Sequence, residues 1–108
     1  MTTIGIIGEH DPGNETHVAT DDALGHAAAA LGIAVEAAWV STVDVVDAAR
    51  DLARFGGLLV APGSPYRSME GALRAIEHAR RHDVPLLGTC GGFQHVVIEY
   101  ARNVLGIA

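Results

Sequence analysis

Apolar residues follow two patterns along this chain, and the two patterns alternate. Short continuous apolar runs are typical of buried strands, whereas apolar residues that recur roughly every three or four positions are typical of helices packed on one side. The runs that predict strands span residues 4–8, 33–40, 57–61 and 85–88. The periodic segments that predict helices span residues 16–31, 43–52, 68–81 and 91–104.

Residues suited to ending or starting a helix flank three of the periodic segments. Gly32 tolerates the left-handed conformation in which helices commonly end. Ser41 and Thr42 are suited to cap the second helix, and Ser68 is suited to cap the third. The side chains that we expect to face the core are Val18, Ala23, Ala27 and Leu31 in the first helix, Met69, Leu73, Ile76 and Ala79 in the third, and Phe93, Val96, Val97, Tyr100, Ala101 and Val104 in the last.

The alternation of strands and helices predicts an α/β fold. Strands that are apolar throughout are typical of a parallel sheet with helices on both faces, so we expect a flavodoxin-like, three-layer α/β/α domain. The 108 residues have room for one domain. Functional side chains in such folds lie at the carboxyl ends of the strands, which here are followed by residues 9–14, residues 62–67 and Cys90.

The only cysteine, Cys90, lies between Gly88 and Gly92, where a predicted strand meets a predicted helix. This spacing is the cysteine version of the G-x-S-x-G nucleophile elbow, a turn too tight for side chains on both sides of the nucleophile. The turn places the sulfur at a helix N-terminus, which favours the thiolate. A lone cysteine can also be a buried, inert thiol, but the glycine spacing favours a nucleophile.

Charge and cysteine content exclude several classes of partner. The formal net charge of −6 disfavours nucleic acids and anionic membranes. A single cysteine cannot form an internal disulfide, and neither a signal peptide nor an apolar run long enough for a membrane span is visible, so we expect a cytoplasmic protein. No histidine spacing predicts a metal site. We interpret Arg80-Arg81 as a solvated helix end.

The elbow and the residues after it resemble one known family. Residues 88–94 and the run at residues 97–106 resemble the glutaminase domain of CTP synthase, which is a class I glutamine amidotransferase. Residues 59–63 and 69–71 are similar to the P-G-G loop of that family and the helix after it. The resemblance covers essentially the whole chain. It is closer still to stand-alone proteins related to the CTP synthase C-terminal region, which share the P-G-S-P-Y and T-C-G-G-F-Q-H variants.

The resemblance implies a role for five residues. Cys90 matches the nucleophile that attacks the side-chain amide of glutamine, giving a glutamyl thioester and ammonia. The backbone N–H groups of Gly91 and Ser64 match the two oxyanion donors, and Gly63 and Gln94 match positions that contact the substrate. The implied partners are glutamine and a synthetase that receives the ammonia, and no cofactor is implied.

The chain departs from the family pattern in several places. Ser64 replaces a glycine, Pro65-Tyr66 replaces Phe-Gly, and Gly91 replaces a larger apolar residue. The catalytic His-x-Glu pair of the family has no match, because it lies beyond the position of Ala108. We therefore expect residues 1–108 to be the N-terminal half of an amidotransferase domain. An unpaired sheet edge and an uncovered face would then pack against the missing half, a partner or another copy of the chain.

The histidines offer few candidates for the missing base. His95 is five residues past Cys90, and we interpret it as a packing residue. We interpret His78 and His82 as surface residues at a helix end. The remaining candidates are His10 and His17, which flank the first loop and can reach the crevice at the strand ends.

Three functions stay open at this point. The first is a glutaminase like that of CTP synthase, whose ammonia passes to a synthetase. The second is a non-catalytic, shortened amidotransferase-like module that binds a ligand or partner. The third is a DJ-1-like cysteine protein, in which an acidic residue from early in the chain lies beside the thiol. Glu9 would be that residue, and its alternative interpretation is a solvated loop carboxylate.

Overall fold

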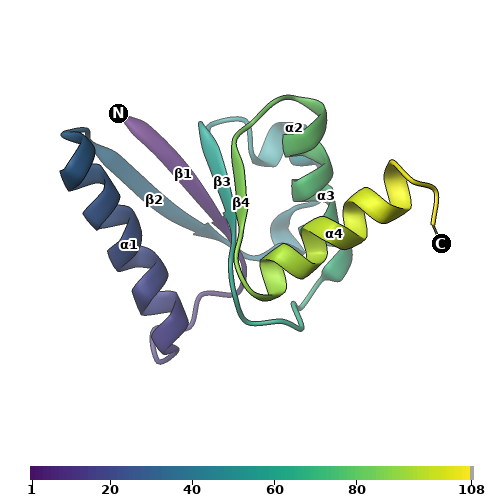
Figure 1. The fold of residues 1–108 in the computed structure, drawn as a ribbon, viewed down its shortest axis with the longest axis horizontal. Coiled ribbons are helices and arrows are strands. Elements are labelled where there is room, and N and C mark those ends of the chain that lie inside the picture. The colour runs from purple at the N-terminus through teal and green to yellow at the C-terminus, as the bar shows by residue number, and fades with distance from the viewer. Residues whose placement is uncertain (108) are drawn as a thin grey trace.

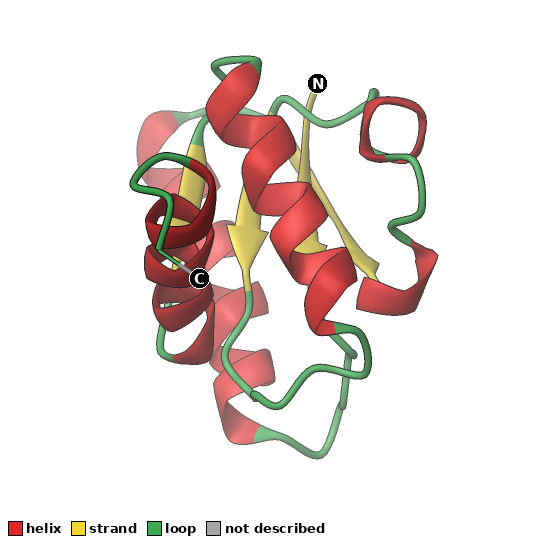
Figure 2. Ribbon diagram, turned by 90° about the vertical axis from the view of Figure 1, so that its right-hand side faces the viewer, coloured by secondary structure: helices red, strands yellow, loops and turns green. Residues whose placement is uncertain are grey.

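A computed structural model describes residues 1–107 and confirms the predicted α/β fold. Its sheet is parallel, with the strand arrows pointing the same way (Figure 2), and the strand order is β2-β1-β3-β4. The strands are β1 (Thr2–Ile7), β2 (Val35–Val40), β3 (Gly57–Val60) and β4 (Leu86–Gly88). The helices are α1 (Glu15–Leu31), α2 (Ala48–Asp51), α3 (Met69–Arg81) and α4 (Gly91–Asn103), and a 3₁₀ turn, η1 (Thr42–Asp44), precedes α2.

The strand order places a crevice at the middle of the sheet. The chain runs outward from β1 to β2 and in the other direction from β3 to β4, so the order reverses between β1 and β3. Ligands of open α/β sheets bind at the carboxyl ends of the strands beside such a reversal. Ile7 pairs with Val60, and Val60 pairs with Gly88, so β1, β3 and β4 end at the same level. The segments that follow these three strands therefore meet.

The helices lie on the two sides of the sheet (Figure 1). Helix α1 stands alone on one side, where Leu24 and Trp39 pack against Ile6 and Leu59. Helices α2, α3 and α4 gather on the other side, over a larger core. That core contains Ile7, Val45, Leu52, Phe55, Leu58, Val60, Tyr66, Ala72, Leu73, Ala75, Ile76 and Ala79.

The helix predicted over residues 43–52 is wrong. The structure has η1 there, followed by the four-residue helix α2, which the Asp47 side chain caps by accepting a hydrogen bond from Arg50 N–H. Thr42 does not cap a helix, because its N–H and hydroxyl both bond to Glu9. Val45 is fully buried in a non-helical conformation between η1 and α2, so core packing interrupts the helix. The predicted caps at Gly32 and Ser68 are confirmed.

The predicted core faces of α1 and α4 are also wrong. The side of α1 that faces the sheet carries His17 and Leu24, whereas Val18 and Leu31 are exposed. The buried residues of α4 are Gly91, Gly92, His95 and Glu99. The expected stripe of α4 is largely exposed at Phe93, Val97, Tyr100 and Val104, while Val96 packs on the core. The prediction rests on the usual burial of apolar side chains. In the structure, most of the side chains in these two stripes are exposed.

Arg80 lies at an exposed helix end, as the sequence predicts, and from there it neutralises a buried carboxylate. Glu99 is only 1% exposed, and Arg80 Nε and Nη2 each donate to it at 2.9 Å. Asn103 Nδ2 donates to the same carboxylate at 2.9 Å. Burial alone would raise the pKa of Glu99, but these donors outweigh it and lower the pKa. The ion pair therefore joins α3 to α4.

One edge and part of one face of the sheet are open, as the sequence predicts. Strand β4 is an end strand, and Leu87 on its α1 side is 58% exposed. Among the described residues, no helix is both long and apolar enough to cross a bilayer.

Candidate active site

Cys90 occupies the strained turn that the glycine spacing predicts. It follows β4 directly and is the N-cap residue of α4, with φ 53° and ψ −117°. A side-chain-bearing residue rarely adopts this conformation, and such strain persists only where the surrounding structure enforces it. A Cβ on Gly92 would lie 2.0 Å from Val60 O, and a Cβ on Gly88 would lie 2.8 Å from Gly92. Both glycines are thus required by close backbone contact, and the thiol that they support is exposed.

Ser64 and Gly91 lie against each other beside the thiol. The position that a Cβ would take on Gly91 is 2.8 Å from Ser64 Cβ and Oγ, and 3.2 Å from Ser64 N. The two residues whose N–H groups the resemblance assigns to the oxyanion are therefore neighbours, from segments 27 positions apart in the sequence. The side chain of Ser64 fills the space that a larger residue at position 91 would need. The two departures from the family pattern thus fit each other.

Three side chains hold the loop of residues 61–67, which carries Ser64. His17 Nε2 lies 2.9 Å from the carbonyl oxygen of Pro62. The hydroxyl of Tyr66 donates to the carbonyl of Ala61, and Arg67 N–H donates to Glu9. Burial, together with the nearby Cys90 and Glu9 charges, raises the pKa of Tyr66 to about 12, so its hydroxyl remains a donor at neutral pH.

Glu9 joins three loops at the strand ends. Its Oε1 accepts from Ser41 Oγ at 3.0 Å, Thr42 N at 2.7 Å and Thr42 Oγ1 at 2.6 Å, and its Oε2 accepts from Arg67 N at 3.2 Å. Burial alone would raise the pKa of Glu9, but these hydrogen bonds outweigh it and lower the pKa. The interpretation of Glu9 as a solvated carboxylate is therefore wrong. In residues 1–107 its hydrogen bonds go to these donors and none goes to Cys90.

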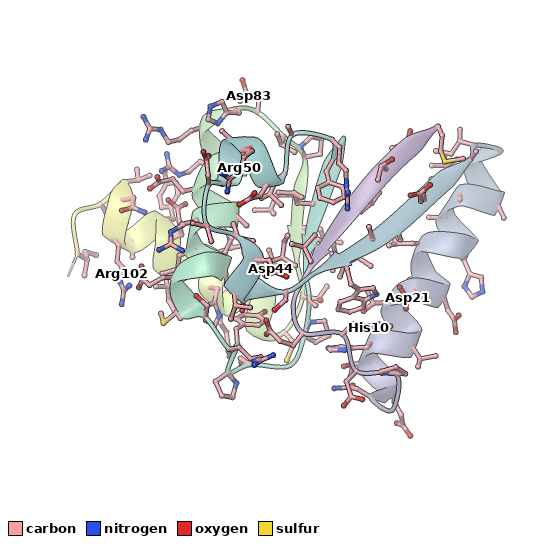
Figure 3. The ribbon with its side chains drawn as sticks, turned by 180° about the vertical axis from the view of Figure 1, so that it is seen from behind. His10, Asp21, Asp44, Arg50, Asp83 and Arg102 are labelled. Carbon is pink, nitrogen blue, oxygen red and sulfur yellow. The ribbon has the colours of Figure 1, made fainter. Side chains whose placement is uncertain are left out.

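Five of the six histidines make side-chain contacts in the described part of the chain, and His26 is exposed. His95 is buried, its Nδ1 lies 2.7 Å from Gly91 O, and its ring meets Tyr66 edge-on, which confirms the packing role. His78 and His82 stack on each other near the surface end of α3. His10 stacks on Trp39, with its Nε2 3.7 Å from Asp21 (Figure 3). Within residues 1–107 no hydrogen bond joins a histidine to Cys90.

An apolar groove opens beside the thiol. It has a volume of about 530 Å³ and runs between α1 and the uncovered face of β3 and β4, with Cys90 at one end. Thr89 also lines the groove, and its buried hydroxyl oxygen has no hydrogen-bond partner among the described residues. The wall of the groove is formed by Thr16, Ala19, Thr20, Ala23, Leu24, Ala27, Leu59, Pro62, Leu87, Thr89 and Cys90. Gln94 is exposed on the first turn of α4.

Sequence reasoning found Cys90 but missed the residues that hold its surroundings. The contacts of His17 with Pro62 and of Tyr66 with Ala61 have no local signal, since they depend on the folded sheet. In the part of the chain that the structure describes, no group of three or more histidine, cysteine, aspartate or glutamate side chains is placed to hold a metal ion.

Comparison with known proteins identifies relatives along the whole chain. A family model described as glutamine amidotransferase class-I matches residues 17–107. A CTP synthase from Nitratidesulfovibrio vulgaris is 42% identical over 110 residues, which cover all of this chain and 20% of that protein. A CTP synthase from Methanopyrus kandleri is 38% identical, over 96% of this chain and 20% of that protein. The chain thus spans about one fifth of the length of these relatives.

A solved structure shares the fold and the elbow region. It is described as the glutaminase domain of Trypanosoma brucei CTPS with bound acivicin. The TM-score is 0.86 at 25% identity, over 98% of this chain and 42% of that one. Taken with the family match over residues 17–107, this similarity shows that the chain belongs to the class I glutamine amidotransferases and resembles the glutaminase domain of CTP synthase.

Proposed function

We propose that this chain carries the nucleophile and the oxyanion donors of a glutaminase. The observation that supports the proposal most directly is the strained elbow at Cys90, with Ser64 and Gly91 packed against each other beside it. In the reaction, the Cys90 thiolate bonds to the side-chain amide carbon of glutamine. The carbon–nitrogen bond then breaks, and the nitrogen leaves as ammonia after it gains a proton. Water hydrolyses the resulting glutamyl thioester to glutamate and regenerates the thiol.

The backbone donors act on the negative charge that forms during the attack. When sulfur adds to the amide carbon, the carbonyl oxygen becomes an oxyanion, and the N–H groups of Ser64 and Gly91 donate to it. Fixed donors of this kind cost no reorganisation during the reaction, and loss of one typically slows catalysis by roughly 10²–10³. Gly63 turns the loop that carries Ser64, and Gln94 is exposed one helical turn after Cys90, which supports the proposal that both contact the substrate.

The general base is proposed to come from polypeptide that covers the apolar groove. The groove is open beside Cys90, and Leu87, which lines it, is 58% exposed. Both features fit a further segment packed at this place, and the matched CTP synthases are about five times as long as the aligned region. We therefore propose that residues 1–108 form the N-terminal part of an amidotransferase domain. The covering segment belongs to a longer protein, a partner or a second copy.

The substrate and the acceptor follow from the relatives. Acivicin, bound in the similar structure, is a glutamine analogue, so glutamine is the proposed substrate. The relatives are CTP synthases, so we propose that the ammonia passes to a synthetase like the one in those enzymes, in pyrimidine nucleotide synthesis. The cytoplasm remains our predicted compartment, on the basis of the single cysteine.

Labelling with acivicin tests the proposal. The protein is incubated with acivicin, with and without the proposed covering polypeptide, and the modified peptide is identified by mass spectrometry. We expect modification of Cys90 when the covering polypeptide is present, and none in Cys90→Ser. Cys90→Ser is nearly isosteric, so the fold is kept as a control. Modification that persists in Cys90→Ser would contradict the proposal.

A non-catalytic binding module is the second candidate. It is favoured by the absence of any hydrogen bond between a histidine and Cys90 in residues 1–107. A module of this kind would bind glutamine without releasing ammonia, even with its covering polypeptide. Measuring ammonia release from glutamine in the complete protein distinguishes the two candidates.

A further inference from the structure

His17 is buried in the first turn of α1 and contacts the loop that carries Ser64. Its side chain is 4% exposed, its Nε2 lies 2.9 Å from Pro62 O, and its Nδ1 accepts from Asp11 N–H at 3.0 Å. A backbone N–H can only donate and a carbonyl oxygen can only accept. The two contacts therefore fit one state of the ring, the neutral imidazole with hydrogen on Nε2.

The contact with Pro62 reaches the backbone just before the proposed oxyanion donor. The Pro62 carbonyl belongs to the peptide that enters Gly63, and the next peptide carries the N–H of Ser64. Gly63 has φ +108°, a conformation that side chains rarely adopt, and a Cβ there would lie 3.2 Å from His17 Nε2. The imidazole thus closes over the turn. A donor that fixes the Pro62 carbonyl fixes the peptide plane next to the one that carries the Ser64 N–H, so only φ and ψ of Gly63 separate the held group from the donor.

The imidazole is itself held in place by its neighbours. The ring centroids of His17 and Trp39 are 4.6 Å apart, and Trp39 Nε1 donates to Asp21 at 3.0 Å. His10 stacks on the same indole at 4.5 Å. The aromatic contacts and the two hydrogen bonds leave the His17 ring little freedom to turn.

We propose that His17 is a positioning residue for the oxyanion hole, acting on the Ser64 N–H through the Pro62 carbonyl. This inference rests on the proposed glutaminase function. Neither ring nitrogen is free for proton transfer, so His17 is not the missing base. Its role is to aim a backbone donor. Misplacement of such a group by about 1 Å can cost on the order of 10²-fold in rate.

Two substitutions separate the two hydrogen bonds of His17. The amide NH₂ of Gln, in His17→Gln, takes the place of Nε2–H and keeps the donor to Pro62. In His17→Asn the shorter side chain reaches only the position of Nδ1, so it keeps the bond from Asp11 and loses the bond to Pro62. His26→Asn is the matched control, because His26 is exposed on the same helix.

The experiment compares two electrophiles on the complete protein. Acivicin capture builds negative charge at the oxyanion position, whereas iodoacetamide only alkylates the thiol. We expect His17→Asn to slow Cys90 modification by acivicin on the order of tenfold to a hundredfold, with iodoacetamide modification unchanged. His17→Gln and His26→Asn should stay within about threefold of the parent rate. Equal acivicin rates in His17→Asn and His17→Gln, or an equal loss with both electrophiles, would overturn the proposal.

An NMR measurement tests the same proposal without depending on activity. Long-range ¹H–¹⁵N spectra should show the Nε2–H tautomer of His17, and His17→Asn should shift the Ser64 amide signal where His17→Gln does not. The Nδ1–H tautomer, or a Ser64 signal unaffected by His17→Asn, would overturn the positioning role. Failure of wild-type acivicin labelling together with the expected spectra would instead refute the glutaminase function alone.

Discussion

At the scale of single residues, Ser64 and Gly91 share one volume beside the nucleophile. A side chain added at Gly91 would come within 2.8 Å of Ser64 Cβ and Oγ, so the loop and the elbow can approach only if one of the two positions is small. This chain places its side chain at position 64 and its glycine at position 91. The approach brings the two proposed oxyanion donors together.

Gly91→Ala should therefore destabilise the protein and slow Cys90 labelling. Overpacking at such a contact typically costs about 1–3 kcal/mol, and the double variant Ser64→Gly/Gly91→Ala should recover most of it. Gly25→Ala is the control, because nothing lies within 4 Å of a Cβ there. Urea unfolding and acivicin labelling measure both effects. A double variant no better than Gly91→Ala would show that Ser64 is not the obstacle.

Glu9 gives the protein a pH-dependent contribution to stability. Its pKa in the folded state is below the ordinary value of 4.5. The contribution is therefore complete above about pH 4.5 and is lost as the pH falls through the lower, folded-state pKa. We expect Glu9→Gln to lower the free energy of unfolding at pH 7 by about 1–3 kcal/mol, as for other bonds to a charged acceptor. The difference from the parent should shrink below pH 4.5, and a difference independent of pH would contradict this account.

The nucleophile could be predicted from sequence, whereas the residues around it could not. Gly88 and Gly92 act within a few positions of Cys90, so their spacing is visible in the chain. Glu9 bonds Thr42, 33 positions away in the sequence, and His17 bonds Pro62, 45 positions away. Such contacts exist only after the carboxyl ends of β1 and β3 have been aligned.

At the scale of elements, the Arg80–Glu99 ion pair links α3 to α4. Removing one partner of a buried pair leaves an uncompensated charge, which is costly. Because Glu99 would then stay buried without its cation, Arg80→Met should destabilise the protein more than the loss of an exposed ion pair does. The double variant Arg80→Met/Glu99→Met should lie closer to the parent.

The matched control for this pair is Arg102→Met. Arg102 approaches Glu70 at 3.9 Å on the surface, and exposed pairs contribute roughly 0–1 kcal/mol. Thermal and urea unfolding of the variants give the comparison. Similar losses in Arg80→Met and Arg102→Met would show that burial of Glu99 is unimportant.

The order of the elements was predictable because apolar runs and helical spacing are local patterns. The break at Val45 was not, because it depends on a core contact of that residue. The faces of α1 and α4 were mispredicted for a related reason. An apolar stripe predicts that a helix face packs against something. It does not show whether the partner is the sheet of this chain or other polypeptide.

At the scale of the whole molecule, the groove on the α1 side of the sheet and the stripe of α4 on the other side are two apolar surfaces open to further polypeptide. In the stripe, Phe93, Val97, Tyr100 and Val104 are between 43% and 60% exposed. Exposed apolar surface of this kind marks an interaction site. We expect the isolated 108-residue chain to self-associate in sedimentation experiments, and Val97→Ser/Val104→Ser to reduce the association. A parent chain that is monomeric at high concentration would contradict this prediction.

The central claim is that Cys90 forms a covalent glutamyl intermediate. The most direct measurement is rapid acid quenching of the complete protein during glutamine turnover, followed by mass spectrometry of the peptide that contains Cys90. We predict a glutamyl thioester on Cys90 that hydroxylamine releases as the hydroxamate, and that is absent in Cys90→Ser. Ammonia release that continues in Cys90→Ser, or turnover with no adduct on Cys90 at any quench time, would contradict the account.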